Sequence, residues 1–266
     1  MKYALGTIIG TALLGLVKAK RGGKNRYTPI KIEDIYKLSK TKKTQITRLD
    51  LSYNNYLTQL PDDIFDGFTK LKWLDLRGNQ LTELSQSIGN LTNLKKLYLS
   101  ENQLTELPDS IGNLTNLTSL ELRKNELTEL PEWIGDLTNL EDLHVWGNQL
   151  TELPEWIGNL TNLKSLYLSG NQLTELPKSF GNLTKLEELD LDDNKLTELP
   201  KSFGSLTKLR YLSLSNNPLQ KRIPKEIIIK MIQNGADAES QTIIQTIQEI
   251  IKINNSIPVK SNLRLR

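Results

Sequence analysis

The stretch that decides the fold is Leu163-Lys-Ser-Leu-Tyr-Leu-Ser-Gly-Asn171-Gln-Leu-Thr-Glu-Leu-Pro177. Written as L-x-x-L-x-L-x-x-N-x-L-x-x-L-P, the same pattern returns every 23 residues, in units that begin at Leu71, Leu94, Leu117, Leu140, Leu163, Leu186 and Leu209. A looser copy begins at Ile46. The chain of 266 residues is therefore organised by a repeat of eight units, which must stack because one unit cannot bury its apolar face alone.

Each unit holds an alternating apolar pattern that predicts a short β-strand. In the quoted unit, Leu166 and Leu168 would point to the interior, and the residues between and beside them would point to solvent. An asparagine follows each strand, and we expect its amide to satisfy backbone groups that the next turn leaves unpaired. These residues are Asn79, Asn102, Asn125, Asn148, Asn171, Asn194 and Asn217. Their chemistry indicates a structural role.

The outer half of each unit carries a proline and a glycine at fixed positions. We expect the prolines to stiffen the bend and the glycines to serve a tight outer turn. The prolines are Pro61, Pro108, Pro131, Pro154, Pro177 and Pro200, with Ser85 breaking the column. The glycines are Gly89, Gly112, Gly135, Gly158, Gly181 and Gly204.

The units resemble leucine-rich repeats, in the variant with a proline and an I-G-N-L segment, as in residues 107–117. The resemblance covers residues 46–222. It implies an α/β fold: a curved, right-handed solenoid with one parallel β-sheet on the concave side, short irregular or 3₁₀ segments outside and helical caps at both ends. The ubiquitin ligases of this family need a catalytic Cys, and the chain has none.

Composition divides the chain into further segments. Residues 1–20 contain a hydrophobic segment, residues 21–45 a basic linker and a short cap helix opened by Pro29, and residues 223–266 two cap helices and a basic tail. Residues 1–48 carry 12 Lys or Arg against 2 Asp or Glu, residues 49–217 carry 14 against 25, and residues 218–266 carry 8 against 4. The acidic body argues against nucleic-acid binding.

Residues 3–17 form an uncharged apolar run of 15 residues. As a helix the run would span about 22 Å, against a bilayer core of about 30 Å. A basic cluster follows at Lys18, Lys20, Arg21, Lys24 and Arg26. By the positive-inside bias, this pattern predicts a membrane anchor with the repeats on the cytoplasmic side. The alternative is a cleaved signal peptide, which would make the protein secreted or place it at the cell surface.

The outward strand positions are informative because packing does not dictate their identity. Aromatic residues and arginine, typical anchors of protein interfaces, gather there in the middle units and are followed by acidic residues. The candidate binding residues are Trp73, Tyr98, Glu121, Arg123, His144, Trp146, Tyr167, Glu188, Asp190 and Asp192. This pattern predicts that the concave face binds a protein, with an acidic end that favours basic segments.

Two further columns would lie away from these positions. Six glutamates (Glu83, Glu106, Glu129, Glu152, Glu175 and Glu198) recur at one position, where we expect a solvated rim. Trp133 and Trp156 occupy equivalent places in Pro-Glu-Trp-Ile segments and would either cover a local gap or form a second contact surface.

No residue pattern indicates catalysis. The sole histidine, His144, has no Cys or second His with which to form a metal site. We therefore expect a non-catalytic protein-binding module without a cofactor, a metal or a small-molecule substrate, tethered to a membrane through residues 3–17. One alternative is a structural component that cements a large membrane-associated assembly. Another is an exported receptor-like or ligand-binding protein.

Overall fold

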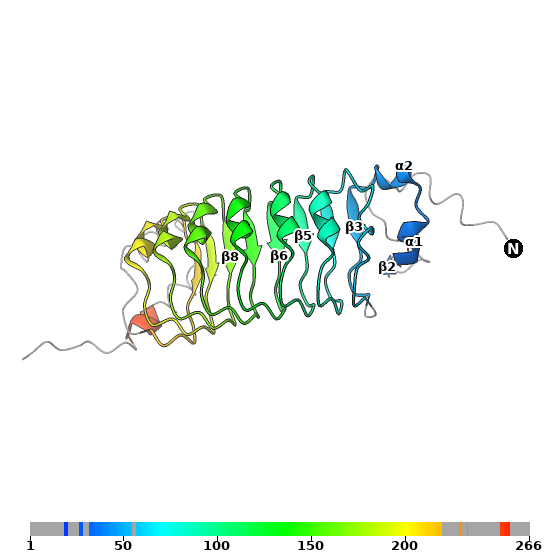
Figure 1. Ribbon diagram of the computed structural model, residues 1–266. Coiled ribbons are helices and arrows are strands. Elements are labelled where there is room, and N and C mark those ends of the chain that lie inside the picture. Colours follow the sequence, from blue (N-terminus) through cyan, green and yellow to red (C-terminus); the bar gives the residue numbers. More distant parts are fainter. Residues whose placement is uncertain are drawn as a thin grey trace, which may run out of the picture.

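The computed structural model describes residues 19–20, 27–28, 32–54, 57–219, 229, 233 and 251–255. Within them, eight three-residue strands form one parallel sheet in which every strand lies beside its neighbours in sequence (Figure 1). The strands are β3 (Arg48–Asp50), β4 (Trp73–Asp75), β5 (Lys96–Tyr98), β6 (Ser119–Glu121), β7 (Asp142–His144), β8 (Ser165–Tyr167), β9 (Glu188–Asp190) and β10 (Tyr211–Ser213). The predicted solenoid with a single parallel sheet is confirmed.

The opposite side of the solenoid is built from short 3₁₀ helices, one in each coil from the second to the seventh. They are η1 (Gln86–Asn90), η2 (Asp109–Asn113), η3 (Glu132–Asp136), η4 (Glu155–Asn159), η5 (Lys178–Asn182) and η6 (Lys201–Ser205). A proline caps each of η2 to η6 in an extended conformation. Where Ser85 replaces the proline, its Oγ accepts a hydrogen bond from the Ser87 N–H at 3.1 Å, so the serine caps η1 through its side chain.

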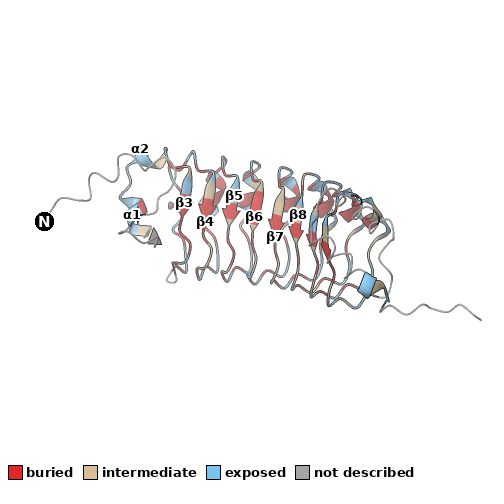
Figure 2. Ribbon diagram, turned by 180° about the vertical axis from the view of Figure 1, so that it is seen from behind, coloured by how far each residue is buried: buried red, intermediate tan, exposed pale blue. Residues whose placement is uncertain are grey.

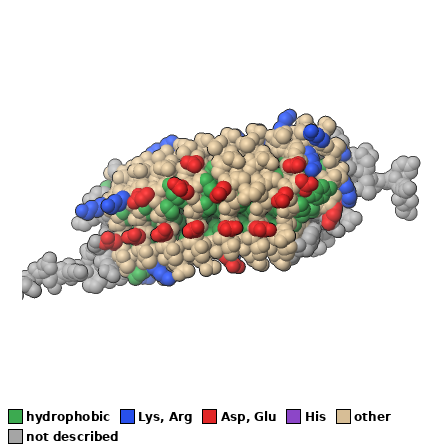
Figure 3. Space-filling model, viewed as in Figure 1, with side chains coloured by type: hydrophobic (Ala, Val, Ile, Leu, Met, Phe, Trp, Pro, Cys, Tyr) green, Lys and Arg blue, Asp and Glu red, His purple; other side chains and the backbone are tan. Residues whose placement is uncertain are grey.

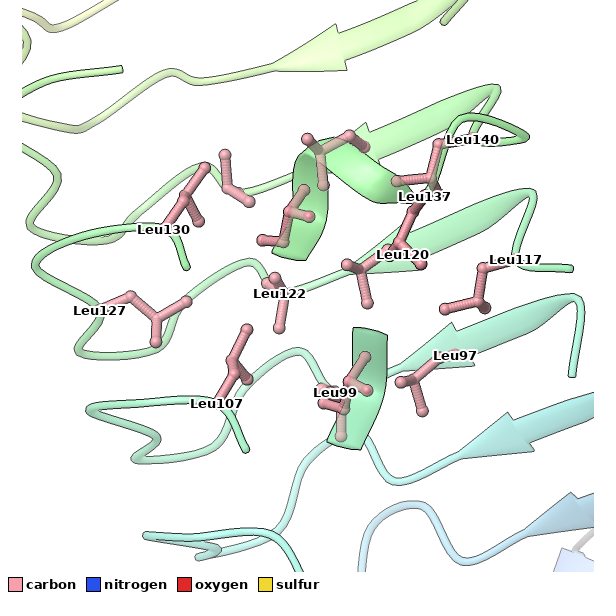
Figure 4. Close-up of a cluster of buried hydrophobic side chains, with 14 of the residues drawn as sticks. Leu97, Leu99, Leu107, Leu117, Leu120, Leu122, Leu127, Leu130, Leu137 and Leu140 are labelled. Carbon is pink, nitrogen blue, oxygen red and sulfur yellow. The ribbon is translucent and has the colours of Figure 1, made fainter. Parts of the chain in front are cut away.

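Leucines fill the space between the strands and the 3₁₀ helices. The middle residue of every strand is buried (Figure 2), and the register places these leucines directly beside one another from coil to coil. In Figure 4, Leu97 lies beside Leu120 of the next coil, and Leu99 lies beside Leu122. The core therefore extends along the whole repeat, and each coil depends on its neighbours for burial.

The asparagine column confirms its predicted role. The Oδ1 atom of Asn148 accepts the backbone N–H of Leu127 in the preceding coil at 3.1 Å. Its Nδ2 donates to the carbonyls of Leu122 and Val145 at 3.0 and 2.9 Å. The same arrangement recurs at Asn102, Asn125, Asn171, Asn194 and Asn217. Each amide thus joins two coils through buried backbone groups.

A left-handed residue precedes the asparagine in every coil, and the repeat pattern did not predict it. The eight residues are Tyr53, Gly78, Glu101, Lys124, Gly147, Gly170, Asp193 and Asn216, with φ between 52° and 69°. Only three of them are glycine, the residue that adopts this conformation without steric cost. The bonds that the next asparagine makes on both sides of the turn hold the other five in place.

The glycine column serves a purpose other than the expected tight turn, because positive φ is absent from all six positions. Instead, at five of the six positions the following coil would lie within 3.0 Å of an added Cβ, whereas Gly204 has no described atom within 4 Å. A Cβ at Gly181 would lie 2.4 Å from the carbonyl oxygen of Ser202, and one at Gly135 would lie 3.0 Å from the Cβ of Trp156. The glycines therefore set the spacing between neighbouring 3₁₀ helices.

The predicted N-terminal cap helix is split and begins later than expected. Residues 27–28 form β2 (Tyr27–Thr28), which pairs antiparallel with β1 (Ala19–Lys20), and the helical residues are α1 (Ile32–Tyr36) and α2 (Lys40–Lys43). The break occurs at Ser39, whose Oγ accepts the N–H of Lys42 and starts a new helix. Ile35 is fully buried in the common hydrophobic core.

At the other end, residues 251–255 are helical and Ile253 packs against the core. The rest of the two predicted C-terminal helices lies outside the described residues, except for positions 229 and 233, which are helical. The predicted apolar anchor at residues 3–17 also lies outside them. In the part of the chain that the structure describes, no helix is both long and apolar enough to cross a membrane.

Candidate protein-binding face

The strand register places the predicted binding residues in straight columns across the concave sheet. In the first column Trp73, Ser165 and Glu188 lie in register with their equivalents on the neighbouring strands. In the middle column Tyr98 pairs with Glu121, and Glu121 pairs with His144. All ten predicted residues therefore lie on one face or at the strand ends that continue it.

Aromatic and cationic side chains that contact one another cover strands β3 to β5. The Arg48 guanidinium lies over the Trp73 ring at 4.4 Å, and Trp73 meets Tyr98 edge to face with ring centroids 5.8 Å apart. Arg77 lies over Tyr98 at 4.9 Å. Cation–π and ring contacts of this kind fix the orientation of large side chains before any partner arrives. We did not identify Arg48 and Arg77 from the sequence, although each occupies an outward column beside a predicted aromatic residue.

Arg77 is held in turn by carboxylates on both sides. Its Nε and Nη2 donate to the two oxygens of Asp75 at 2.9 and 2.6 Å, and Nη1 lies 3.8 Å from Glu121. The hydrogen bonds that Arg77 donates to Asp75 raise the pKa of Arg77, and partial burial opposes this shift. The guanidinium is therefore a fixed, permanently charged feature of the face.

The centre of the face is built around Trp146. Arg123 lies over its ring at 5.5 Å, and the Nζ of Lys124 at 5.2 Å. Arg123 also lies 3.6 Å from Glu101. The Nε of Arg123 and the Oγ of Ser100 are buried, and neither has a hydrogen-bond partner in the described part of the chain. The centre of the face therefore retains unused hydrogen-bonding capacity.

His144 and Tyr167 form the next contact, edge to face with ring centroids 4.6 Å apart. Burial lowers the pKa of His144, while Glu121 and Asp142 act in the opposite direction. The Tyr167 hydroxyl donates to Glu188, and burial together with this bond raises the pKa of Tyr167. At neutral pH this part of the face therefore presents a neutral imidazole and a neutral phenol.

The acidic end is ordered by hydroxyl groups. Asp190 accepts hydrogen bonds from the Ser169 hydroxyl at 2.9 Å and from the Asp192 N–H at 3.1 Å. Asp192 accepts from the Ser213 hydroxyl at 2.5 Å and the Ser215 N–H at 2.6 Å. Burial raises the pKa of Asp192, and these bonds oppose the shift. The carboxylates are thus held at fixed positions on the sheet.

The face is divided by charge. The three outward columns of the first four coils contain four cations (Arg48, Arg77, Lys96 and Arg123) and three carboxylates (Asp50, Asp75 and Glu121), whereas those of the last four contain four carboxylates (Asp142, Glu188, Asp190 and Asp192) and no Lys or Arg. The aromatic residues lie between and within both halves. Such a surface can orient an extended or folded partner by its own charge distribution.

Comparison with known proteins agrees with this geometry. The family profile described as "Leucine-rich repeat region" matches residues 30–156, and a second, "Leucine rich repeat", matches residues 138–196 and 161–219. The chain belongs to the leucine-rich-repeat family. The comparison with curated proteins finds no match for it.

Solved leucine-rich-repeat structures share the fold. The protein LIC12759 from Leptospira interrogans is 37% identical with a TM-score of 0.68, over 73% of this chain and 48% of that one. The ectodomain of the receptor kinase GASSHO1/SCHENGEN3 from Arabidopsis thaliana is 34% identical with a TM-score of 0.65, over 71% and 23%. The Arabidopsis receptor kinase HAESA is 31% identical with a TM-score of 0.62, over 69% and 32%. The chain thus spans about half of the Leptospira protein and less of each receptor.

Two other features of this leucine-rich-repeat domain lie outside the binding columns. The six glutamates are all exposed, and Figure 3 shows acidic side chains in a row along the solenoid. Trp133 and Trp156 are partly buried against the core, where they cover Gly112 and Gly135 of the preceding coils. This packing favours the interpretation that the two tryptophans cover a local gap.

Proposed function

We propose that this leucine-rich-repeat protein binds a protein partner on its concave face, through Trp73, Tyr98, Glu121, Arg123, His144, Trp146, Tyr167, Glu188, Asp190 and Asp192. The observation that carries the proposal is the three groups of ring and cation contacts, around Trp73, Trp146 and Tyr167, that follow one another along the accessible sheet. Large side chains that are already ordered lose little conformational entropy on binding, which favours affinity. The proposed partner meets an aromatic centre with a zone of mixed charge on one side and an acidic zone on the other.

Leucine-rich-repeat relatives support this proposal. The GASSHO1/SCHENGEN3 ectodomain is described in complex with CASPARIAN STRIP INTEGRITY FACTOR 2, and HAESA in complex with the peptide hormone IDA and the co-receptor SERK1. These are properties of those receptors. For the present chain they favour a protein or peptide as the ligand of the same kind of solenoid.

The proposal is tested by a pair of matched double variants in the full chain. His144→Ala with Trp146→Ala removes the centre of the concave face, while Glu152→Ala with Lys178→Ala changes two exposed residues away from the concave columns. Interface anchors of this type cost more than about 1 kcal/mol each when truncated, so we expect at least a tenfold loss of affinity only in the first variant. Equal affinity of the two variants, with unchanged circular dichroism, would refute a concave site.

We also propose that residues 3–17 tether the protein to a membrane, with the repeats on the cytoplasmic side. Their apolar run and the basic cluster that follows support this proposal. The second candidate is a surface or secreted protein, which the receptor ectodomains among the relatives favour. The mass of the mature protein separates the two, since loss of about 19 residues marks a cleaved signal peptide.

A further inference from the structure

A pocket of about 380 Å³ opens at the N-terminal end of the concave sheet. It is lined by Thr47, Arg48, Lys72, Trp73, Lys95, Lys96 and Tyr98. Four of these seven residues are cations, two are aromatic, and none is acidic. The four cationic side chains are all exposed to solvent. Such a lining concentrates positive charge over an aromatic floor.

The positive charge of this pocket has no neutralising carboxylate among the residues that the structure describes. Within the described residues, none of the four cations forms an ion pair. The buried carboxylates of the adjoining strands are engaged elsewhere, with Asp75 bonded to Arg77 and Asp50 to Ser52. The charged group of Arg48 lies over the face of the Trp73 ring, and in the described part of the chain it forms no ion pair.

The same column at the other end of the sheet shows the contrast. Lys164 occupies the position equivalent to Lys72 and Lys95, and its Nζ lies 2.7 Å from Glu141 of the preceding coil. Arg210, also equivalent, lies 3.7 Å from Glu187. Among the described residues, the cations of this column thus have an acidic neighbour at one end of the sheet and none at the other.

We propose that this pocket binds a phosphate ester carried by a side chain of the partner protein. A phosphate monoester brings a charge of about −1.5 to −2 and three acceptor oxygens at neutral pH, which suits several converging cations better than one carboxylate does. Arg48 provides a planar fork, and the lysines provide point charges. Trp73 and Tyr98 offer apolar contact to the side chain that bears the phosphate.

The location favours a protein ligand over a lipid headgroup. Trp73 and Tyr98 line the pocket and are also the first members of the aromatic set on the concave sheet, so one extended segment can occupy both. This inference rests on the proposed function, because it assigns a chemistry to one end of the same face. A phospholipid membrane is the competing source of phosphate, and the experiment below therefore includes phosphatidylserine vesicles.

The test uses the full chain and isothermal titration with N-acetyl-phosphotyrosine amide, with N-acetyl-tyrosine amide as the unphosphorylated control. We expect saturable binding of the phosphorylated probe only. Because hydrogen bonds between charged groups are stronger than those between neutral ones, Lys72→Ala with Lys95→Ala should weaken that binding at least about tenfold. Lys164→Ala removes the same charge from the same column three coils away and should leave binding unchanged.

Three results would overturn the proposal: no saturable binding of the phosphorylated probe, equal binding by the Lys72/Lys95 variant, or equal binding of both probes. Binding to phosphatidylserine vesicles that depends on Lys72 and Lys95, without binding of the probe, would assign the pocket to lipid instead. If the partner is lost from the His144/Trp146 variant but binds the Lys72/Lys95 variant normally, the proposed function stands and the phosphate inference fails.

Discussion

Replacing Asn148 by alanine tests how the coils are held together. The amide of Asn148 accepts the N–H of Leu127 at 3.1 Å and donates to the carbonyls of Leu122 and Val145. The side chain of Leu127 is 1% exposed, and Leu122 and Val145 are fully buried. Water therefore has little access to the groups that the substitution would leave behind.

The expected loss of stability depends on which of these backbone groups keeps a hydrogen-bond partner. The carbonyl of Leu122 still receives the amide of Asn125 at 2.9 Å, and that of Val145 the amide of Asn171 at 3.1 Å. The N–H of Leu127 has no such second partner in the described structure. One orphaned buried donor costs about 1–3 kcal/mol, and the two weakened carbonyls add about 0.5 kcal/mol each, for a total of about 2–4 kcal/mol.

Asn139→Ala in the preceding coil is the matched control. The Nδ2 of Asn139 donates to the carbonyl of Thr115 at 2.9 Å, but the pair is exposed, so water can replace the bond at a cost below about 1 kcal/mol. Urea unfolding followed by circular dichroism measures both variants against the parent chain. The free energy of unfolding could fall by less than about 1 kcal/mol in Asn148→Ala, or by equal amounts in the two variants. Either result would refute the role of Asn148 in joining the coils.

Two further predictions concern other parts of the structure. Gly181→Ala should destabilise the protein by about 1–3 kcal/mol because the new Cβ would meet the backbone of Ser202. Gly204→Ala should be neutral or slightly stabilising, because no described atom lies within 4 Å of its Cβ. Thermal unfolding measures both variants, and equal losses of stability would contradict the spacing role of the glycines. Burial lowers the pKa of His144 in the folded protein below the ordinary histidine value of about 6.5. The stability that depends on a neutral His144 is therefore fully present above about pH 6.5 and is lost as the pH falls from there through the lower folded-state pKa. The parent chain should therefore lose more stability than His144→Gln between about pH 7.5 and 5.5, and parallel pH profiles would contradict this prediction.

The repeat itself is predictable because its chemistry is local. A fixed spacing of leucines sets the strand, and the asparagine after it must bond nearby backbone, so Leu166, Leu168 and Asn171 could be assigned from the sequence. The parallel register follows from stacking, and it brings together residues 23 positions apart, as the pairing of Glu121 with His144 shows. The columns of the binding face were therefore predictable as positions.

The hydrogen bonds and ring contacts that side chains form within those columns could not be predicted from the sequence. Arg77 had several carboxylates within reach of its column, and only the structure shows that it bonds Asp75 rather than one further along the sheet. A second asparagine column was also missed: Asn93, Asn116, Asn139 and Asn162 each donate to the carbonyl of a threonine in the preceding coil. Its constant position in the repeat was a visible signal.

The left-handed residue before each buried asparagine was missed for a different reason. Gly78, Gly147 and Gly170 suggest the conformation, but Glu101 and Lys124 adopt it too, and their residue types predict otherwise. Tertiary bonds across the turn override the local preference there. The same holds for the outer glycines, whose role depends on contacts with the next coil.

Site-directed photocrosslinking tests directly whether the concave face binds the partner. A benzophenone side chain at Ser165, on strand β8 of the concave sheet, is compared with one at Lys178, on the 3₁₀ helix η5 of the same turn of the solenoid. We predict that a protein partner in the native cell is captured from Ser165 and not from Lys178. Capture from Lys178 alone would contradict a concave binding face.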